Sequence, residues 1–287
     1  MKLEVSKNRA KIVQISDVHI SYPIIEASKI AISKVIEAEQ PDLVVFSGDL
    51  FHRPHHRQEG LKLVIEFIQF IDSFKTKYTL CFGNHDSEIN ISKYEMFELF
   101  TAQSKYFIGE IGDLELTRFH LNDDHYKEPR IGNFYIDVEN NGQLITRVTM
   151  LDSGRYNKSG GYGSLTSTQT AYVQLSNPTN VPNLIFFHIA LPEFEELYKD
   201  YRVSGLKREN VCYQTENCEL FEWALTQDNP IHISCGHDHL NDFSIVKENV
   251  SLNMCPGLCY EEYNENGIRG YLVFTVDNEV IIKINRI

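Results

Sequence analysis

Five short stretches of the chain hold residues whose types suit metal binding or proton transfer. They are Asp17-Val18-His19, Gly48-Asp49, Gly83-Asn84-His85-Asp86, the lone His188, and Gly236-His237-Asp238-His239. Their candidate ligands are carboxylate, imidazole and amide groups, with no thiolate. This ligand set suits borderline divalent ions such as Mn, Fe or Zn rather than a structural zinc bound by cysteines. The ligands are too many for one ion, so their number predicts two ions that share a bridging carboxylate.

Each stretch follows an apolar run that is typical of a buried strand. These runs are residues 11–16, 42–47, 78–82, 183–187 and 231–235. Residues 23–39 and 57–74 lie between the first three runs and carry apolar side chains at helical spacing. Alternating strands and helices predict a parallel sheet with right-handed crossovers. Functional residues gather beyond the carboxyl ends of such strands, which is where the polar stretches lie.

The second half of the chain has a different pattern. Residues 131–138 and 144–151 flank an Asn-Gly turn, which predicts a β-hairpin. Residues 164–175 and 215–225 have helical patterns, and residues 244–252 and 270–284 are expected to be antiparallel strands that close a second sheet. The chain contains no low-complexity tract and no linker rich in Pro, Gly or Ser. We therefore predict one α/β domain over residues 1–287, with two mixed sheets packed face to face and helices outside.

The bulk composition excludes some partners. The chain has 287 residues and a formal net charge of −13, which argues against charge-driven binding to nucleic acid or anionic membranes. No apolar run approaches the roughly 18 residues of a membrane span. The polar start shows no secretory signal, so a cytoplasmic location is expected. The six cysteines are then expected to be reduced thiols that serve packing, since their spacings are not those of zinc pairs.

Each stretch also has a simpler interpretation when it is taken alone. His237 and His239 are compatible with an ordinary pair of surface histidines. Asp17, Asp49 and Asn84 are compatible with helix caps or turns. For Asp86, the cap and the functional role carry nearly equal weight. The occurrence of all five stretches, each at a strand end, favours one common site.

In this order the stretches resemble the motifs of the calcineurin-like metallophosphoesterases, which are D-x-H, G-D, G-N-H-D/E, a lone H and G-H-x-H. Residues 151–154, 186–194 and 236–243 further resemble the branch of small phosphoesterases related to purple acid phosphatases. That branch includes a yeast dosage-dependent cell-cycle regulator phosphatase and plant purple acid phosphatase-like proteins. The resemblance covers most of residues 11–276 and implies a four-layer sandwich fold.

The resemblance implies a role for each residue of the five stretches. One metal ion would be held by Asp17, His19 and His239, and the second by Asn84, His188 and His237, with Asp49 as the bridge. His85 would protonate the leaving oxygen or hold the phosphate, with Asn84 beside it, and Asp86 would orient His85. The positive charges of two divalent ions outweigh the negative charges of two aspartates and a bridging hydroxide. The site would therefore carry a net positive charge within an acidic protein.

One position departs from the purple acid phosphatases. They carry a tyrosine ligand three residues after the bridging aspartate, whereas this chain has His52 there. The iron-tyrosinate colour is therefore expected to be absent. We expect His52, with His55 and His56, to line the substrate entrance, although a solvated histidine loop explains them equally well.

Five further residues near the motifs are candidates for lining the site or contacting the substrate. Asp238 and Asn241 lie beside the last ligands and are expected to touch substrate. Tyr156 and Tyr162, within a glycine-rich stretch, are candidates for a wall of the site, and Arg155 is the candidate for phosphate contact.

The resemblance implies hydrolysis of phosphomonoesters, including phosphoproteins, by attack of a metal hydroxide on phosphorus. One alternative is a phosphodiesterase that acts on cyclic nucleotides or other small diesters. Another is a scaffold that binds metal without catalysis, which the complete set of motif residues disfavours. A nuclease is disfavoured because no basic stripe is present. A small phosphoester or a phosphoprotein is the expected partner, with no nucleic acid and no membrane, and the oligomeric state is left open.

Overall fold

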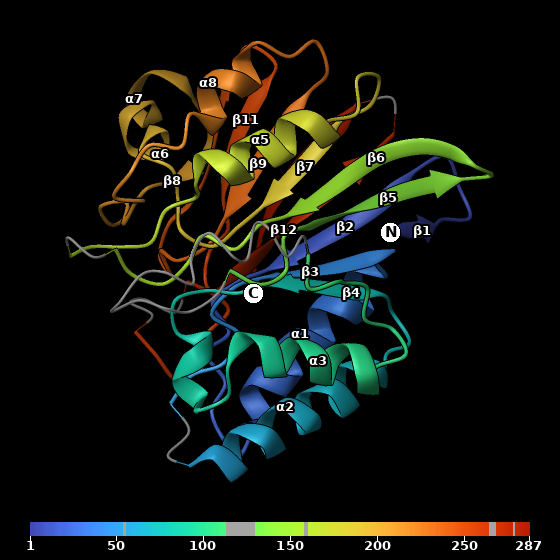
Figure 1. Ribbon diagram of the computed structural model, residues 1–287, viewed down its shortest axis with the longest axis vertical. Helices are drawn as coiled ribbons and strands as arrows, with labels where there is room; N and C mark the ends of the chain where they lie inside the picture. Colours follow the sequence, from blue (N-terminus) through green and yellow to red (C-terminus); the bar gives the residue numbers. More distant parts are fainter. Residues whose placement is uncertain (54–55, 113–129, 158–159, 264–267, 278) are drawn as a thin grey trace.

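Two mixed β-sheets lie face to face in the computed structural model, and helices cover their outer faces (Figure 1). The structure describes residues 1–53, 56–112, 130–157, 160–263, 268–277 and 279–287. The order of layers is helices, a five-stranded sheet, an eight-stranded sheet and helices again. This arrangement confirms the predicted four-layer α/β sandwich.

The five-stranded sheet contains the first three predicted strands. Its order is β13-β12-β2-β3-β4, and β2, β3 and β4 run parallel. The bounds are β2 Ala10–Ile15, β3 Leu43–Ser47, β4 Tyr78–Cys81, β12 Gly270–Val276 and β13 Val280–Arg286. Because every residue of β3 and β4 is buried, both strands are as apolar as the sequence pattern requires. Their carboxyl ends meet at one edge of the sheet.

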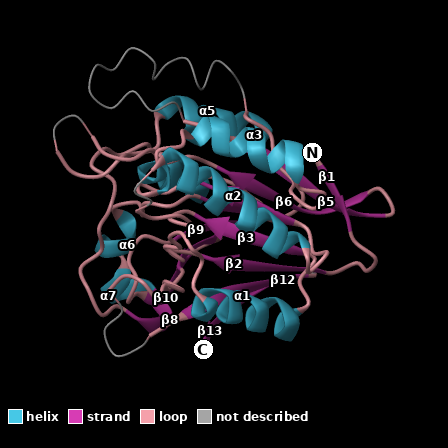
Figure 2. Ribbon diagram, turned by 90° about the horizontal axis from the view of Figure 1, so that it is seen from below, coloured by secondary structure: helices cyan, strands magenta, loops and turns pink. Residues whose placement is uncertain are grey.

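Three helices cover the outer face of this sheet (Figure 2). They are α1 Glu26–Glu39, α2 Arg57–Asp72 and α3 Lys93–Gln103, and a short 3₁₀ helix, η1 Asp86–Ile89, precedes α3. No prediction covered α3, although its start carries a sequence signal. Ser92 accepts a hydrogen bond from the Glu95 backbone N–H, and the Glu95 carboxylate accepts one from the Ser92 backbone, which forms a capping box.

The eight-stranded sheet has the order β1-β5-β6-β7-β9-β11-β10-β8. Its strands are β1 Lys2–Glu4, β5 Phe134–Asn140, β6 Gln143–Met150, β7 Asn183–Phe186, β8 Arg202–Leu206, β9 Ile231–Cys235, β10 Asp242–Lys247 and β11 Val250–Met254. Strands β6, β7, β9 and β11 are parallel neighbours, and β5 and β6 form the predicted hairpin. The outer face carries α5 Ser167–Ser176, α6 Glu193–Glu196, α7 Tyr198–Tyr201 and α8 Leu220–Leu225.

The space between the sheets is filled by apolar side chains from both. Phe186 on β7 meets Phe274 on β12 edge to face, with ring centroids 5.4 Å apart. Burial of each such ring stabilises the fold by about 1.5–3 kcal/mol. Gln14 is a fully buried polar exception, and its amide donates to Ser47 of the same sheet and to the Cys235 carbonyl of the other sheet. The sheets are therefore held together close to the ends of β3 and β9.

Three predicted helices begin later in the structure than the sequence pattern indicates. One of them, predicted from residue 164, begins at Ser167 after the N-cap Thr166. The first helix begins at Glu26 rather than at residue 23, because Ile25 has an extended backbone. The predicted helix 215–225 is reduced to Leu220–Leu225. Glu219 has a left-handed backbone with φ of 59°, and a right-handed helix cannot continue through such a residue.

The prediction that residues 244–252 and 270–284 close the same sheet is wrong. Strands β10 and β11 form a hairpin within the eight-stranded sheet, where β11 pairs with β9. Strands β12 and β13 form a second hairpin that extends the five-stranded sheet through β2. Alternating apolar residues specify a strand but not its partner, because either sheet offers the same kind of edge.

Among the described residues, the helices are too short and too polar to span a membrane.

Candidate metal centre

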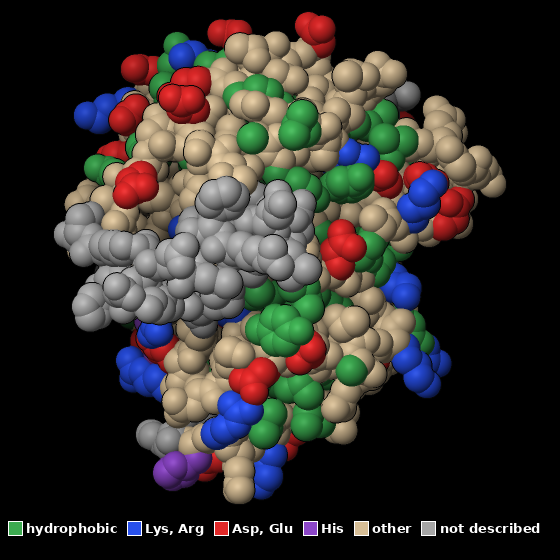
Figure 3. Space-filling view, in the orientation of Figure 1, with side chains coloured by type: hydrophobic (Ala, Val, Ile, Leu, Met, Phe, Trp, Pro, Cys, Tyr) green, Lys and Arg blue, Asp and Glu red, His purple; other side chains and the backbone are tan. Residues whose placement is uncertain are grey.

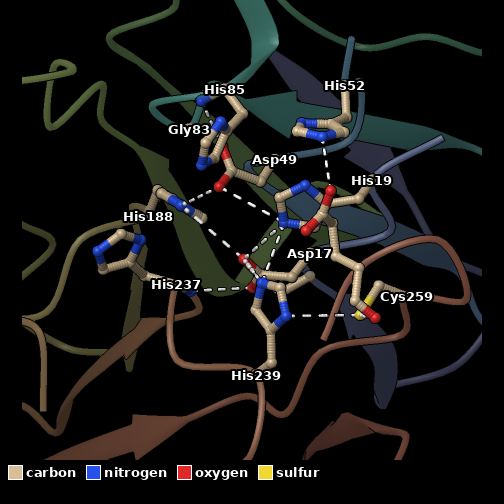
Figure 4. A network of polar contacts seen from close by, with 12 residues as sticks. Asp17, His19, Asp49, His52, Gly83, His85, His188, His237, His239 and Cys259 are labelled. Atoms are coloured by element: carbon tan, nitrogen blue, oxygen red, sulfur yellow. Dashed lines mark hydrogen bonds and ion pairs between the residues drawn. The ribbon is translucent and has the colours of Figure 1, made fainter. Parts of the chain in front are cut away.

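The five motif stretches meet between the two sheets, at the carboxyl ends of their parallel strands (Figure 4). Asp17 follows β2, and Asp49 follows β3. His188 follows β7, and His237 and His239 follow β9 in the other sheet. Neither sheet alone carries the whole set, so the packing of the sheets assembles the site.

A first group of possible metal ligands consists of Asp17, His19 and His239. One ligand atom from each of these residues lies within 4.8 Å of the others. Nε2 of His19 and Nε2 of His239 are 3.0 Å apart, and Oδ1 of Asp17 lies 3.7 Å from each of them. This is the trio that the sequence assigned to one ion.

A second group consists of Asp49, His188 and His237. Oδ2 of Asp49 lies 3.0 Å from Nε2 of His188 and 3.7 Å from Nε2 of His19, which belongs to the first group. Asp49 therefore lies between the two groups, where a bridging ligand must be. Asn84 is fully buried and lines the same pocket.

Several buried polar atoms of these residues have no hydrogen-bond partner among the residues that the structure describes. They are Oδ1 of Asp17, both amide atoms of Asn84 and Nε2 of His237. A buried polar atom without a partner costs about 1–3 kcal/mol, so a cluster of them at one point requires another explanation. Nitrogen and oxygen donors that converge in this way fit two divalent cations.

Backbone carbonyls fix the orientation of two imidazole rings. Nδ1 of His188 lies 3.0 Å from the Ser47 carbonyl, and Nδ1 of His239 lies 3.0 Å from the Tyr263 carbonyl. Only a protonated Nδ1 can donate to a carbonyl, so in the neutral form of each ring Nε2 is the ligand atom. Each Nε2 faces the centre.

The loops that carry the ligands have unusual backbone conformations. Asp17, His19, Asp49 and His237 all have positive φ, between 49° and 76°. Non-glycine residues rarely adopt this region, and such strain is concentrated at functional sites. Gly83 is required for the same packing, because a Cβ there would lie 2.1 Å from Oδ1 of Asp49.

The electrostatics keep both aspartates ionised. Burial alone would raise the pKa of Asp49, but His188 and the other histidines outweigh it and hold that pKa well below its usual value. Burial also opposes ionisation of Asp17, but the nearby histidines, chiefly His188, hold the pKa of Asp17 below its usual value. Burial lowers the pKa of His237 to about 3, so this ring is neutral and its Nε2 lone pair is available to a cation.

His85 lies at the pocket, but its neighbour Asp86 does not orient it. Both oxygens of Asp86 accept backbone N–H groups, from Gly83, Asp49 and Phe51. The prediction that Asp86 orients His85 is therefore wrong, because its carboxylate is already used to fix the two ligand loops. Nδ1 of His85 instead lies 3.0 Å from Oε1 of Glu88.

The entrance is a pocket of about 150 Å³. His52 lines it, as expected, and its Nε2 lies 2.7 Å from Oε1 of Glu262. Tyr156 and Tyr162 also line the pocket. The Tyr162 ring packs edge to face against the His237 ring, with ring centroids 4.3 Å apart. Of the other two histidines expected there, His56 is the exposed N-cap of α2, and His55 lies outside the described residues.

Asp238 and Asn241 lie close to the site but do not line the pocket. Both are buried, and Asp238 accepts hydrogen bonds from the Cys212 backbone and from Asn241. Asn241 in turn accepts the backbone N–H groups of Arg208 and Glu209. The structure thus replaces the predicted substrate contacts with a structural role, because these side chains hold the segment 208–212 in place.

Arg155 forms an ion pair with Glu88. Its guanidinium donates to Oε1 of Glu88 over 3.0 Å, and the phosphate contact stays a prediction.

Sequence reasoning missed four residues around the centre, namely Glu88, Cys259, Glu262 and Tyr263. Tyr263 stacks on His239 with ring centroids 4.3 Å apart, and Cys259 Sγ lies 3.5 Å from Nδ1 of the same ring. No motif marks the last three, because the loop that carries them reaches the site only through the tertiary fold. Glu88 had a local signal, since it lies one turn after His85.

Comparison with known proteins places this geometry in context. Residues 10–241 match the family described as calcineurin-like phosphoesterase. The phosphatase DCR2 of Saccharomyces cerevisiae is 25% identical over 290 residues, which cover 90% of this chain and 48% of the yeast protein. The chain therefore spans about half the length of that relative.

A second relative and a solved structure agree with this match. An Arabidopsis thaliana protein named probable inactive purple acid phosphatase 14 is 24% identical, over 90% of this chain and 73% of its own length. A crystal structure of a dimetal phosphatase from Danio rerio superposes with a TM-score of 0.65 at 13% identity, and the match covers 96% of each chain. At this identity the superposition shows a shared fold.

Proposed function

The chain belongs to the calcineurin-like phosphoesterase family, and we propose that it is a metal-dependent hydrolase of phosphomonoesters. The observation that carries the proposal is the ligand set. Two trios of histidine and aspartate converge, and Asp49 lies between them. The proposed dinuclear centre has Asp17, His19 and His239 on one side, Asn84, His188 and His237 on the other, and Asp49 in common.

The ions and the protein have separate tasks in this proposal. When they are bound, two divalent ions supply an activated water molecule and neutralise charge on the phosphoryl oxygens. The protein holds the ligands in a buried, pre-arranged geometry, with Nε2 of His188 and His239 directed inward by backbone carbonyls. His85 lines the pocket beside Asp49, and it gives a proton to the leaving oxygen.

The size of the pocket favours monoesters over diesters. Its volume of about 150 Å³ is below the roughly 300–1,000 Å³ of sites for drug-sized ligands. A phosphoryl group with one ester arm fits such a pocket better than a diester with two bulky arms. The yeast relative is itself named a phosphatase.

The surface does not favour a nucleic-acid substrate. The net charge is −13, and the described part of the face in Figure 3 has acidic and basic side chains interspersed. A phosphoprotein or a small phosphoester remains the proposed substrate.

One plant relative is named a probable inactive purple acid phosphatase, so an experiment must first test whether this chain catalyses hydrolysis. We propose to compare hydrolysis of p-nitrophenyl phosphate and bis-p-nitrophenyl phosphate after loading with Mn, Zn, Fe or Mg. The expected result is metal-dependent hydrolysis with the monoester as the better substrate. Faster hydrolysis of the diester would support a phosphodiesterase. Two bound ions without turnover of either ester would support a scaffold.

The role of His85 is tested by His85→Ala. This variant is expected to keep both ions and to lose about 10²–10⁴-fold in kcat. His56→Ala, which changes an exposed histidine of the same chain, is the control and is expected to keep full activity. An unchanged rate in His85→Ala would rule out the proposed proton donor.

A further inference from the structure

Glu88 lies at the centre of a polar cluster beside the pocket. It follows His85 by three residues in η1, and its Oε1 lies 3.0 Å from Nδ1 of His85. Its other oxygen, Oε2, lies 3.6 Å from Nδ1 of His52. The Glu88 backbone N–H also donates to the His85 carbonyl over 2.8 Å, so the turn that joins the two residues is well defined.

The two nitrogens of the His85 ring have different surroundings. Nδ1 is buried and lies 3.0 Å from Oε1 of Glu88 without the alignment of a hydrogen bond, while the side chain as a whole is 30% exposed and lines the pocket. The exposed part therefore lies on the other edge of the ring, which carries Nε2. The His85 backbone N–H donates to Oδ1 of Asp49 over 2.8 Å, which anchors the residue beside the metal centre.

Arg155 fixes the Glu88 carboxylate from the opposite sheet. Its Nη2 donates to Oε1 over 3.0 Å, and an ion pair of this kind keeps the carboxylate charged and in place. Arg155 follows β6 through a turn in which the Gly154 N–H donates to Asp152. Asp152 is in turn paired with Lys93 of α3, so the turn is tied to the core.

We propose that Glu88, held by Arg155, is the positioning residue for His85. In the reacting complex its carboxylate accepts a hydrogen bond from Nδ1–H and thereby keeps Nε2 directed at the leaving oxygen. This inference rests on the proposed function. In the step that it serves, the oxygen of the attacking water forms a bond to phosphorus, the bond between phosphorus and the leaving oxygen breaks, and Nε2 gives its proton to the leaving oxygen. His85 ends the step neutral, and Glu88 stays an anion throughout.

Two other uses of the cluster fit less well. Asp86 is not the positioning residue for His85, because its carboxylate already accepts three backbone N–H groups. A third metal ion between His52, His85 and Glu88 is disfavoured, because the Arg155 guanidinium already lies against the Glu88 carboxylate and would repel it.

The kinetic test uses leaving groups of different quality. Glu88→Ala is expected to lose about 10- to 100-fold in kcat on phenyl phosphate, since orienting partners typically contribute that much. The loss on p-nitrophenyl phosphate is expected to be much smaller, because that leaving group departs without a proton. KM and metal content should not change. Glu88→Gln, which still accepts a hydrogen bond, is expected to recover part of the rate.

Two comparisons make this test specific. In a His85→Ala background, Glu88→Ala is expected to have no further effect, because the two residues act as a unit. Glu98→Ala, which removes an exposed carboxylate from α3, is the matched control and should behave as the unmodified protein. Equal losses on both esters, or additive losses in the double variant, would overturn the proposal, as would three bound ions per chain.

A second readout does not depend on turnover. Long-range ¹H–¹⁵N spectra of the zinc-loaded protein report which nitrogen of His85 carries the proton, and His85→Ala assigns the signal. We expect a protonated Nδ1, and we expect Glu88→Ala to shift the tautomer. An unchanged tautomer would overturn the positioning role even in an active enzyme. A shifted tautomer in a protein without turnover would support the Glu88 contact while contradicting the proposed function.

Discussion

Nε2 of His188 lies 3.0 Å from Oδ2 of Asp49, although the two residues follow strands of different β-sheets. The contact crosses the interface between the sheets at the edge where their parallel strands end. It is close because Gly48 precedes Asp49 with φ of 96°, and a Cβ at Gly48 would lie 2.5 Å from the His188 ring. The candidate metal centre and the packing of the two sheets are therefore one feature of the fold.

Replacement of Asp49 by Asn is expected to remove both metal ions. The carboxylate lies between the two ligand groups, so its charge serves both ions, and asparagine keeps the shape without the charge. Metal content measured by mass spectrometry after dialysis tests this. Asp228→Asn, at an exposed position, is the control. Retention of both ions in Asp49→Asn would refute the bridging role.

The buried ion pair between Lys93 and Asp152 is expected to be sensitive to the loss of one partner. Nζ of Lys93 lies 3.1 Å from Oδ1 of Asp152, and both side chains are almost fully buried. Lys93→Met leaves the Asp152 charge without its partner, so we expect about 3–5 kcal/mol of destabilisation in urea unfolding.

An exposed pair provides the comparison for this prediction. Arg57→Ala, which breaks the ion pair with Glu95 at the surface, should cost less than about 1 kcal/mol. Equal effects of the two substitutions would show that the buried pair has no special role.

The stability of the protein should fall between about pH 4.5 and pH 7 because of Glu193. Burial raises the pKa of this carboxyl to about 7, and Glu222 and Glu196 add to the effect. In the unfolded chain the group ionises near pH 4.5, so its contribution to stability is lost as the pH rises from about 4.5 to above 7.

Glu193→Gln removes this dependence. We expect it to stabilise the protein by about 1–3 kcal/mol at pH 8 and to have little effect at pH 4, as measured by thermal unfolding at both values. Glu196→Gln, at an exposed position of the same short helix, should have little effect at either pH. A gain from Glu193→Gln that does not depend on pH would contradict the assigned cause.

The iron-loaded protein is expected to be colourless. His52 stands three residues after Asp49, where purple acid phosphatases carry their tyrosine ligand. Tyr263, which stacks on His239, directs its hydroxyl to Glu209 over 3.3 Å instead. His52→Tyr is expected to introduce a visible charge-transfer band. A strong band in the unsubstituted protein would show that another tyrosine binds iron.

Much of the site could be read from short sequence patterns, because each ligand lies next to a strand that its own apolar residues specify. Asp17, Asn84 and His188 are predicted in this way. Asp86 and Asp238 were misassigned for a common reason. Both are acidic residues next to a ligand, and the sequence does not reveal that backbone N–H groups occupy their oxygens. Glu88 was overlooked although it lies one turn from His85.

The sequence by itself determined the five ligand stretches, the strands before them and the family, because hydrophobic spacing and motif spacing are local properties. The tertiary structure decided what those stretches meet. It placed the hairpins β10–β11 and β12–β13 in different sheets and brought Cys259 and Tyr263 against His239. It also set Arg155 against Glu88. These contacts join residues far apart in the chain, and only the packing of two sheets brings them together.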